Sequence, residues 1–318
     1  MILTARGRTI EFPRRPLVMG IVNINDDSFA GDGSLDTDRA IKTARSHVLS
    51  GADIIDVGAE SARTNRPAIN EDVEFARLRP FLERFHECYA GVTPLDGSQL
   101  FPPLLSINTW RPRVAEATLR VSGHLLNDIG ALPTDENAVI AAKYGAALLI
   151  MHSVGLPKQK HTHLRYRDIL STLDSFFAHK IHLALDAGLH PEAIVLDPGI
   201  DFAKQRPDNI RILRGLERLK HFERPILLPV SRKTVIGDVL GITNPADRDP
   251  GTIACVVAGM VRGASLFRVH NVHAVVQALR VIYPIVGDLA EQPLGGPGPI
   301  LAQCMTSRTK DDHEHEDD

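Results

Sequence analysis

The chain of 318 residues lacks the features that define several classes of protein. Its three cysteines, Cys88, Cys255 and Cys304, lie far apart, which argues against a disulfide framework or a structural zinc site. No apolar run approaches the ~18 residues of a membrane span. The first fifteen residues also lack the apolar core of a secretory signal. We therefore expect a cytoplasmic protein with free thiols.

An excess of charge of either sign is also missing. The chain has 36 basic and 39 acidic residues, a net charge of −3 and a pI near 6.5. Because no basic patch or stripe stands out, we expect neither nucleic acid nor a membrane surface as a partner. A small-molecule substrate is the remaining expectation, and the 43% hydrophobic content is enough for a full core.

Strand-like apolar runs alternate with amphipathic segments from residue 17 onward. The eight runs are 17–24, 53–57, 104–108, 124–128, 146–151, 193–197, 225–231 and 265–269. The helical segments include 36–50, 71–86, 111–121, 166–187, 208–219 and 252–262. This repeat matches the roughly 250 residues of a TIM barrel. An open doubly wound sheet is the competing architecture, but residues 23–29 lack its glycine-rich phosphate turn.

The pattern divides the chain into three regions. Residues 1–16 predict a short hairpin that caps the bottom of the barrel. Residues 17–285 predict a single (β/α)8 TIM barrel of the α/β class, with Gly-Ala pairs before several strands at tight turns. Residues 286–318 lose periodicity and end in an acidic run, so we expect a disordered tail.

Polar residues gather where the strand-like runs end. They are Asn23, Asp56, Glu60, Asn127-Asp128, Met151-His152, Asp197-Pro198-Gly199, Ser231-Arg232-Lys233 and Arg268-Val269-His270. The carboxyl ends of parallel barrel strands meet at one face, where such barrels build their active sites. The sequence therefore predicts an enzyme site at that face.

These signatures, in this order from about residue 17 to 283, resemble the dihydropteroate synthase family. Met19–Asn23 with Asp27-Ser28-Phe29, Gly51–Gly58 with Glu60-Ser61, and Asn209 add to the resemblance. It implies a TIM-barrel transferase of folate biosynthesis that joins 6-hydroxymethyl-7,8-dihydropterin diphosphate to 4-aminobenzoate, with Mg²⁺ assistance and loss of diphosphate. It also implies a sulfonamide target and a homodimer, for which the helices around 208–219, 252–262 and 272–283 offer apolar faces.

The pterin ring presents a planar edge of donors and acceptors, so its pocket needs a carboxylate, an amide and a cation. The resemblance gives these roles to Asp197, Asn127 and Lys233, with Asn108 as a fourth contact. For Asp197-Pro198-Gly199 the alternative is a turn that ends a strand. For Asn127 the alternative is a loop amide satisfied within the protein.

Departure of diphosphate creates negative charge, which a cationic clamp stabilises. The resemblance assigns diphosphate binding to Asn23, Arg63, Arg268 and His270, with Asn23 as a ligand of Mg²⁺ whose binding depends on the diphosphate. Arg268 and His270 form the catalytic set together with Asp197 and Lys233. A surface ion pair for Arg268 and a solvated loop position for Arg63 are the alternatives.

The acceptor amine is expected beside Phe29, Ala62, Thr64 and Thr234. Thr234 begins the helix after Lys233, where free N–H groups and the helix dipole favour the carboxylate of 4-aminobenzoate. Phe29 would pack on the aromatic ring of the acceptor, and a place in the core is its alternative.

Two residues and two short segments depart from the family pattern. Asn108 stands where the family has aspartate, so we expect weaker catalysis rather than lost binding. The segments 25–32 and 60–65 are altered, which bears on the amine pocket and on sulfonamide sensitivity. Asp201 replaces a glycine near the pterin wall, where we expect Lys204 to neutralise it.

Three hypotheses remain open on the sequence. The first is an active dihydropteroate synthase. The second is a methyl-tetrahydrofolate corrinoid methyltransferase, which shares a pterin-binding barrel but needs no diphosphate clamp. The third is a catalytically impaired or non-catalytic pterin-binding homologue, motivated by Asn108 and the altered loops.

Overall fold

The computed structural model describes residues 1–26, 33–61, 67–155, 157–159 and 164–286. Its strands are β1 (Ile2–Ala5), β2 (Arg8–Glu11), β3 (Leu17–Asn23), β4 (Ile54–Gly58), β5 (Leu104–Asn108), β6 (Leu125–Asp128), β7 (Ala147–Met151), β8 (Ile194–Asp197), β9 (Leu227–Leu228) and β10 (Leu266–Val269). Its α-helices are α1 (Thr37–Leu49), α2 (Glu71–Glu83), α3 (Pro112–Val121), α4 (Glu136–Tyr144), α5 (Ile169–Asp186), α6 (Arg206–Arg214), α7 (Thr234–Leu240), α8 (Asp249–Val261) and α9 (Val272–Val286).

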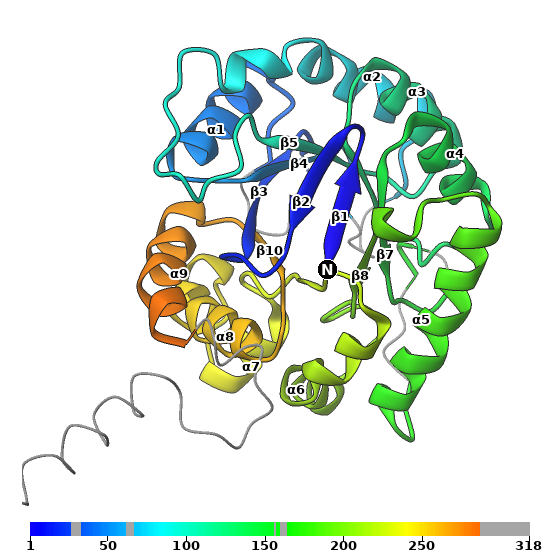
Figure 1. Cartoon of the computed structure of the whole chain (residues 1–318), viewed down its shortest axis with the longest axis vertical. Coiled ribbons are helices and arrows are strands. Elements are labelled where there is room, and N and C mark those ends of the chain that lie inside the picture. Colours follow the sequence, from blue (N-terminus) through cyan, green and yellow to red (C-terminus); the bar gives the residue numbers. More distant parts are fainter. Residues whose placement is uncertain (27–32, 62–66, 156, 160–163, 287–318) are drawn as a thin grey trace, which may run out of the picture.

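Strands β3 to β10 form one parallel sheet of eight strands that curls into a barrel. The sheet order runs β8-β7-β6-β5-β4-β3-β10-β9, and a parallel bridge between Leu196 and Ile226 joins its two ends. The helices surround the strands as an outer ring (Figure 1). The predicted TIM barrel is confirmed, and all eight predicted strand-like runs contain a strand.

The helices follow the predicted segments with local differences. The segment 71–86 gives α2 and then a 3₁₀ turn at Phe85–Cys88, while 208–219 gives α6 followed by 3₁₀ turns at Leu216–Phe222. Helix α4 was not among the predicted segments, because its nine residues carry a weak amphipathic pattern. The glycine of each of the three Gly-Ala pairs has a positive φ, as the predicted tight turns require (Gly51, Gly145 and Gly263).

Two apolar layers hold the barrel together. The outer layer lies between the strands and the helices and includes Val18, Ile55 and Phe177. The inner layer fills the lower part of the barrel with side chains such as Met19 and Leu149. The upper interior is polar instead, so the apolar filling stops where the site begins.

The N-terminal hairpin covers the bottom of the barrel, as predicted. Strands β1 and β2 pair antiparallel, and Leu3, Ala5 and Ile10 pack into the inner layer. In Figure 1 the hairpin crosses the end of the barrel that faces the reader. This plug closes the end opposite the predicted site.

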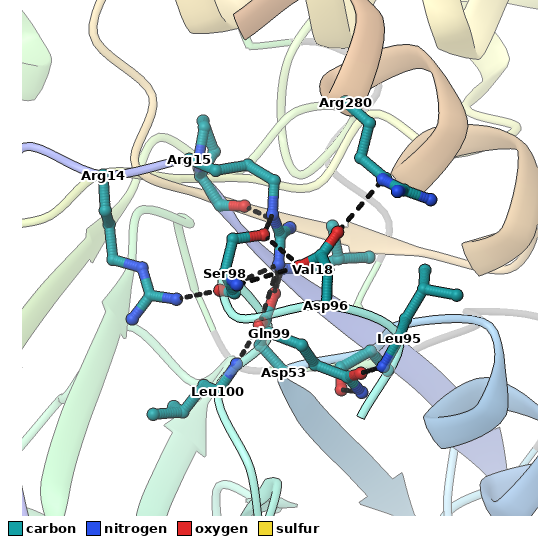
Figure 2. Close-up of polar contacts among 12 residues, drawn as sticks. Arg14, Arg15, Val18, Asp53, Leu95, Asp96, Ser98, Gln99, Leu100 and Arg280 are labelled. Carbon is teal, nitrogen blue, oxygen red and sulfur yellow. Dashed lines mark hydrogen bonds and ion pairs between the residues drawn. The ribbon is translucent and has the colours of Figure 1, made fainter. Parts of the chain in front are cut away.

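A proline-rich segment, residues 90–103, also lies at the bottom and contains no helix. Figure 2 shows how it is tied down: Arg15 and the backbone N–H of Leu100 both donate to Asp53, and Arg280 pairs with Asp96 at 3.0 Å. The segment therefore lies away from the predicted site. Within the described ranges no helix is both long enough and apolar enough to cross a membrane. The predicted disordered tail falls on residues 287–318, outside the described residues.

Candidate active site

A buried carboxylate, Asp56, organises the upper interior of the barrel. It lies in the middle of β4 with no exposed surface. Ser106 Oγ donates to its Oδ1 at 2.5 Å and Asn127 Nδ2 at 3.1 Å, while Arg268 Nε donates to its Oδ2 at 2.7 Å. These partners come from β5, β6 and β10. Asp56 thus orients an amide and a guanidinium that the sequence assigned to the site.

Two amide oxygens next to this network have no hydrogen-bond partner among the described residues. They are Oδ1 of Asn108 and Oδ1 of Asn127, and both side chains are buried. Since buried acceptors almost always meet a donor, an orphaned pair at a barrel mouth indicates a ligand with N–H groups. Asn127 is therefore only half satisfied within the protein, and the predicted alternative of a fully satisfied loop amide does not hold.

Both amides belong to one row of paired residues across the sheet. Asn23 of β3 pairs with Gly58, Gly58 pairs with Asn108, and Asn108 pairs with Asn127. A Cβ at Gly58 would lie 3.2 Å from the Cβ of Asn108, closer than ordinary van der Waals contact. The glycine therefore leaves room between the amides of neighbouring strands.

Asp197 ends β8 on the same face. The N–H of Gly199 donates to its Oδ1 at 2.7 Å, so the predicted turn is present, and the carboxylate is 3% exposed. Burial raises the pKa of Asp197 to about 6, opposed by the Gly199 N–H and by the charges of Lys233, Lys204 and Arg268. The turn and the binding role are compatible, because only one carboxylate oxygen is used by the turn.

Lys233 brings a cation next to Asp197. Its Nζ lies 4.5 Å from the centre of the Phe202 ring, a cation–π contact. Removal from water lowers the pKa of Lys233, whereas the nearby carboxylates of Asp201 and Asp197 raise it. The buried Arg248 holds the backbone at this point by donating to the carbonyl of Lys233 at 3.3 Å.

The residues of the Ser231-Arg232-Lys233 segment contact different partners. Ser231 Oγ accepts from the backbone N–H of His270 at 3.1 Å and lies 2.9 Å from His270 Nδ1. Ser231 Oγ therefore contacts both the backbone and the ring of His270 and holds the ring in place. Arg232 forms a two-bond pair with Asp249 at 2.8 and 3.0 Å. Ser231, which the sequence placed in this strand-end signature without a role of its own, is thus a positioning residue.

A cavity of about 190 Å³ adjoins Asn23 and His270. Arg39, Thr43 and Arg232 also line it, together with apolar side chains (Ile21, Val22 and Ala40). The two arginines suit an anionic group, although Arg232 is already paired with Asp249. The sequence had placed diphosphate binding at Asn23 and His270, and the cavity lies at those two residues.

One further cluster lies at the rim, where the loop after β4 begins. Glu60 is buried between Lys158 at 2.9 Å and Arg111 at 2.6 Å. Lys158 Nζ also donates to the carbonyl of Ser61 at 2.9 Å. These contacts fix the start of a loop whose next residues, including the predicted Ala62, Arg63 and Thr64, lie outside the described part of the chain. The same holds for Phe29.

Two expectations around Asp201 need correction. Lys204 does not pair with Asp201: its Nζ bonds His152 Nδ1 at 2.8 Å and the carbonyls of Gly199 and Phe202 at 2.9 and 3.0 Å. Burial lowers the pKa of Lys204 to about 7 and that of His152 to about 3, so the ring accepts from the lysine. The N–H groups at Thr234, expected to be free, donate to Asp201 instead.

The donor set for a metal is small. The described residues contain no cluster of three or more His, Cys, Asp or Glu side chains that a metal would bind. Asn23 offers one amide oxygen at the edge of the cationic cavity. This set fits a hard cation that arrives with diphosphate oxygens, and it does not fit a metal that the protein holds alone.

Comparisons with known proteins agree with this geometry. A family model described as "Pterin binding enzyme" matches residues 19–270. The chain is 33% identical to the dihydropteroate synthase of Escherichia coli (strain K12), with 89% of this chain and 95% of the relative covered. It is 34% identical to that of Synechocystis sp., with 86% and 92% covered.

Solved structures give the same result. The dihydropteroate synthase of Yersinia pestis in a sulfonamide drug complex has a TM-score of 0.80 and 33% identity, and the match covers 91% of this chain and 100% of that one. The Thermus thermophilus enzyme in complex with 4-aminobenzoate has a TM-score of 0.76 and 32% identity, with 90% and 100% covered.

Proposed function

The chain belongs to the pterin-binding enzymes and, among them, to the dihydropteroate synthases, and we propose that it condenses 6-hydroxymethyl-7,8-dihydropterin diphosphate with 4-aminobenzoate to 7,8-dihydropteroate and diphosphate. The observation that carries this proposal is the set of polar groups in the upper barrel: the buried Asp197, the orphaned oxygens of Asn108 and Asn127, and the cation of Lys233. A flat ring with several N–H donors and a carbonyl matches that set.

In the proposed complex Asp197 accepts from the amino-pyrimidine edge of the pterin. The oxygens of Asn108 and Asn127 accept further ring N–H groups, and Lys233 donates to the carbonyl side. The two amide contacts satisfy oxygens that are otherwise buried without a partner among the described residues. Binding of the ring therefore removes the free-energy penalty of leaving these buried acceptors without hydrogen bonds.

The leaving group lies on the side of β3 and β10 in this proposal. Arg268 and His270 stabilise the negative charge that grows on diphosphate, and Arg63 joins them from the loop after β4. Asp56 holds Arg268 through its Nε, so the two terminal nitrogens of the guanidinium remain to meet phosphate oxygens. Asn23 would hold Mg²⁺ through its amide oxygen, and the ion would supply further neutralisation of the diphosphate when bound.

The chemical step needs no general base at the outset. The bond between the methylene carbon and the diphosphate oxygen breaks, and its electron pair leaves with diphosphate. A ring nitrogen shares the positive charge left on the methylene carbon. The lone pair of the aromatic amine then forms the new carbon–nitrogen bond, and the ammonium proton passes to solvent. The chain's residues orient the ring and stabilise the leaving group.

The methyltransferase alternative is not favoured, because it leaves the Asp56–Arg268 pair and the cationic cavity at His270 without a purpose. A catalytically impaired homologue has one observation in its favour. Asn108 is uncharged, so it stabilises a developing ring cation less than the aspartate of the family pattern. Turnover separates this alternative from the proposal.

The test is diphosphate release by purified protein given the pterin diphosphate, Mg²⁺ and 4-aminobenzoate. We expect release that requires the amine and that Lys233→Ala abolishes. The matched control is Lys143→Ala, which removes an exposed lysine that pairs with Glu116 on the outer surface. The proposal fails if the wild type releases no diphosphate, or if Lys233→Ala and Lys143→Ala behave alike.

Assembly and location are part of the proposal. We propose a homodimer through α8 and α9, because Val281 and Ile285 on α9 are 65% and 55% exposed. A sedimentation experiment that gives only monomers at micromolar concentration would contradict it. A cytoplasmic location accords with the free thiols of Cys88 and Cys255.

A further inference from the structure

The turn between β9 and α7 contains an arginine whose backbone lies in the left-handed region. In this turn, residues 230–233, the N–H of Lys233 donates to the carbonyl of Val230 at 3.3 Å. Arg232, the third residue of the turn, has a φ of 58°. Glycine usually occupies a third turn position with positive φ, because a side chain makes that conformation less favourable. Arg232 therefore needs its surroundings to hold it there.

Three residues at the start of α8 hold Arg232 at its N–H, its carbonyl and its guanidinium. Thr252 Oγ1 accepts from the backbone N–H at 3.0 Å, and Arg248 Nη1 donates to the carbonyl at 3.0 Å. Asp249 accepts two bonds from the guanidinium, at 2.8 and 3.0 Å. Arg248 and Thr252 are buried, which shields their bonds from water. We call Arg248, Asp249 and Thr252 the α8 support.

The α8 support also contacts residues next to the proposed site. Arg248 donates to the carbonyl of Lys233 at 3.3 Å. Asn271, which directly follows His270, donates to Asp249 Oδ2 at 2.9 Å. The support is thus bonded to the backbone of the lysine assigned to the pterin and to the residue after the histidine assigned to the diphosphate.

We propose that the α8 support is a positioning group, which holds Arg232 in the left-handed conformation and thereby directs Lys233 into the pterin pocket. The inference rests on the proposed function, because Lys233 is assigned to the pterin there. Rotation about the backbone of Arg232 moves every atom that follows, and Lys233 is the next residue. A change of that backbone would carry Lys233 Nζ away from its position 4.5 Å from the centre of the Phe202 ring.

An arginine serves this purpose better than the glycine that the turn would accept most easily. Glycine populates positive and negative φ about equally, so it would leave the direction of Lys233 less well defined. The guanidinium of Arg232 gives Asp249 a group to hold, and the conformation of the turn is then fixed from α8.

The experiment measures the dissociation constant of the pterin diphosphate by calorimetry in Arg232→Gly and Arg232→Ala. Both variants lose the guanidinium, and they differ in how well the residue tolerates a positive φ. We expect Arg232→Ala to bind about tenfold more weakly than Arg232→Gly, and the wild type to bind more tightly than either. Equal affinities of the glycine and alanine variants would overturn the inference.

The matched controls are Glu223→Gly and Glu223→Ala. Glu223 is exposed, lies in the segment that leads into β9, and has a positive φ of 55°. This pair should differ in the free energy of unfolding, measured by urea denaturation, but should bind the pterin diphosphate equally. A difference in affinity as large as the one at position 232 would mean that backbone strain acts through stability alone, and the inference would be wrong.

Asp249→Asn tests the support itself, because it removes the charge opposite the guanidinium and keeps an oxygen for Asn271. We expect binding of the pterin diphosphate to weaken about fivefold when Arg232 is present, and to stay unchanged in the Arg232→Gly background, where no side chain remains to be held. An equal loss in both backgrounds contradicts the inference. If Asp249→Asn does not fold, the comparison of glycine with alanine at position 232 decides alone.

A wild type that does not bind the pterin diphosphate counts against the proposed function. In that case crystal structures of Arg232→Gly and Arg232→Ala decide the inference. Displacement of Lys233 Nζ from the Phe202 ring in the alanine variant alone supports it, and an unmoved Lys233 in both variants overturns it.

Discussion

Two buried aspartates three residues apart, at the start and in the middle of one strand, hold an arginine each at opposite ends of the barrel. Asp53 directly precedes β4 and pairs with Arg15 at 3.0 Å, and Asp56 lies within β4 and pairs with Arg268 at 2.7 Å. Both carboxylates have no exposed surface. Their surroundings differ in whether every side chain that bonds the carboxylate has partners for its own polar atoms.

At the lower end the hydrogen bonds of Asp53 and Arg15 are complete, although Nε of the neighbouring Arg14 has no partner among the described residues. Arg15 Nη2 bonds both oxygens of Asp53 at 3.0 and 3.1 Å, and the N–H groups of Val18 and Leu100 donate at 2.7 and 2.8 Å (Figure 2). At the upper end Asp56 is satisfied, but Asn127, which bonds it, keeps an orphaned oxygen beside that of Asn108. We call the Asp53–Arg15 group the closed network and the group of Asp56, Asn127 and Asn108 the open network. The closed network stabilises the fold, whereas the unpartnered oxygens of the open network can bind a ligand.

The largest expected effect comes from breaking the closed network. Asp53→Asn removes the charge opposite Arg15, and the unpaired guanidinium stays buried. We expect the free energy of unfolding to fall by about 3–5 kcal/mol, measured by urea denaturation. The kcat of the remaining folded protein should be unchanged, since the site lies at the other end. A loss of kcat with unaltered stability would reverse the assignment of the two networks.

The matching change at the upper end should act on catalysis. Asp56→Asn leaves Arg268 without its charged partner and weakens the orientation of Asn127. We expect kcat for diphosphate release to fall about 10²–10³-fold, the range seen when one stabilising group of a developing anion is lost. Stability should fall less than in Asp53→Asn. If the two variants lose stability equally and Asp56→Asn keeps its kcat, Asp56 is structural only.

A smaller effect is expected from adding charge to the open network. Asn108→Asp restores a carboxylate where the family pattern has one, and it should stabilise the positive charge that develops on the pterin. We expect kcat to rise about tenfold, equal to about 1.4 kcal/mol of barrier. Steady-state kinetics at saturating substrates checks this, with Asn244→Asp, at an exposed position before α8, as the control. An unchanged kcat would show that the charge at 108 is irrelevant.

The pH dependence of pterin binding probes Asp197. Its pKa of about 6 in the free protein means that it is protonated below that pH and accepts fewer hydrogen bonds from the ring. Affinity for the pterin should fall up to tenfold per pH unit below about 6, measured by calorimetry. Asp197→Asn should bind weakly at every pH and flatten the profile. A wild-type profile that is level between pH 7 and 5 would contradict this.

The pKa of Asp197 also predicts how stability depends on pH: a lower pH should weaken pterin binding but increase the contribution of Asp197 to stability. The folded pKa of Asp197 is raised, so the folded protein binds a proton that the unfolded chain releases between about 4 and 6. Its contribution to stability is present below the unfolded pKa and is lost as the pH rises through 6. Asp197→Asn should therefore raise the melting temperature at pH 7. A lower melting temperature in the variant would show that the ionised form is net stabilising.

The barrel and much of the candidate site could be predicted, because each strand appears in the sequence as an apolar run and its end as a group of polar residues. The apolar runs indicated the eight strands, and the polar residues after them indicated Asp197, Lys233 and Arg268, which the fold brings together. Helix α4 was not predicted from the sequence, because short, weakly patterned helices depend on packing for their stability.

The side-chain networks were harder to predict. Asp56 stands between Ile55 and Val57, and an acid inside such a run is a signal of a buried network, but only the fold shows that Arg268 is its partner. The capping of α7 by Asp201 joins residues 33 positions apart, and no local pattern encodes it. Periodicity specifies elements, whereas contacts between distant side chains follow from how the barrel closes.

The bond between Asp56 and Arg268 spans 212 residues, from the second strand of the barrel to the last. During synthesis the chain emerges from its N-terminus, so Asp56, Ser106 and Asn127 are available long before Arg268. The proposed clamp for the leaving group consequently forms only when β10 docks between β3 and β9. The complete pair between Asp56 and Arg268 is therefore acquired late in biogenesis, only after the last strand of the barrel has docked.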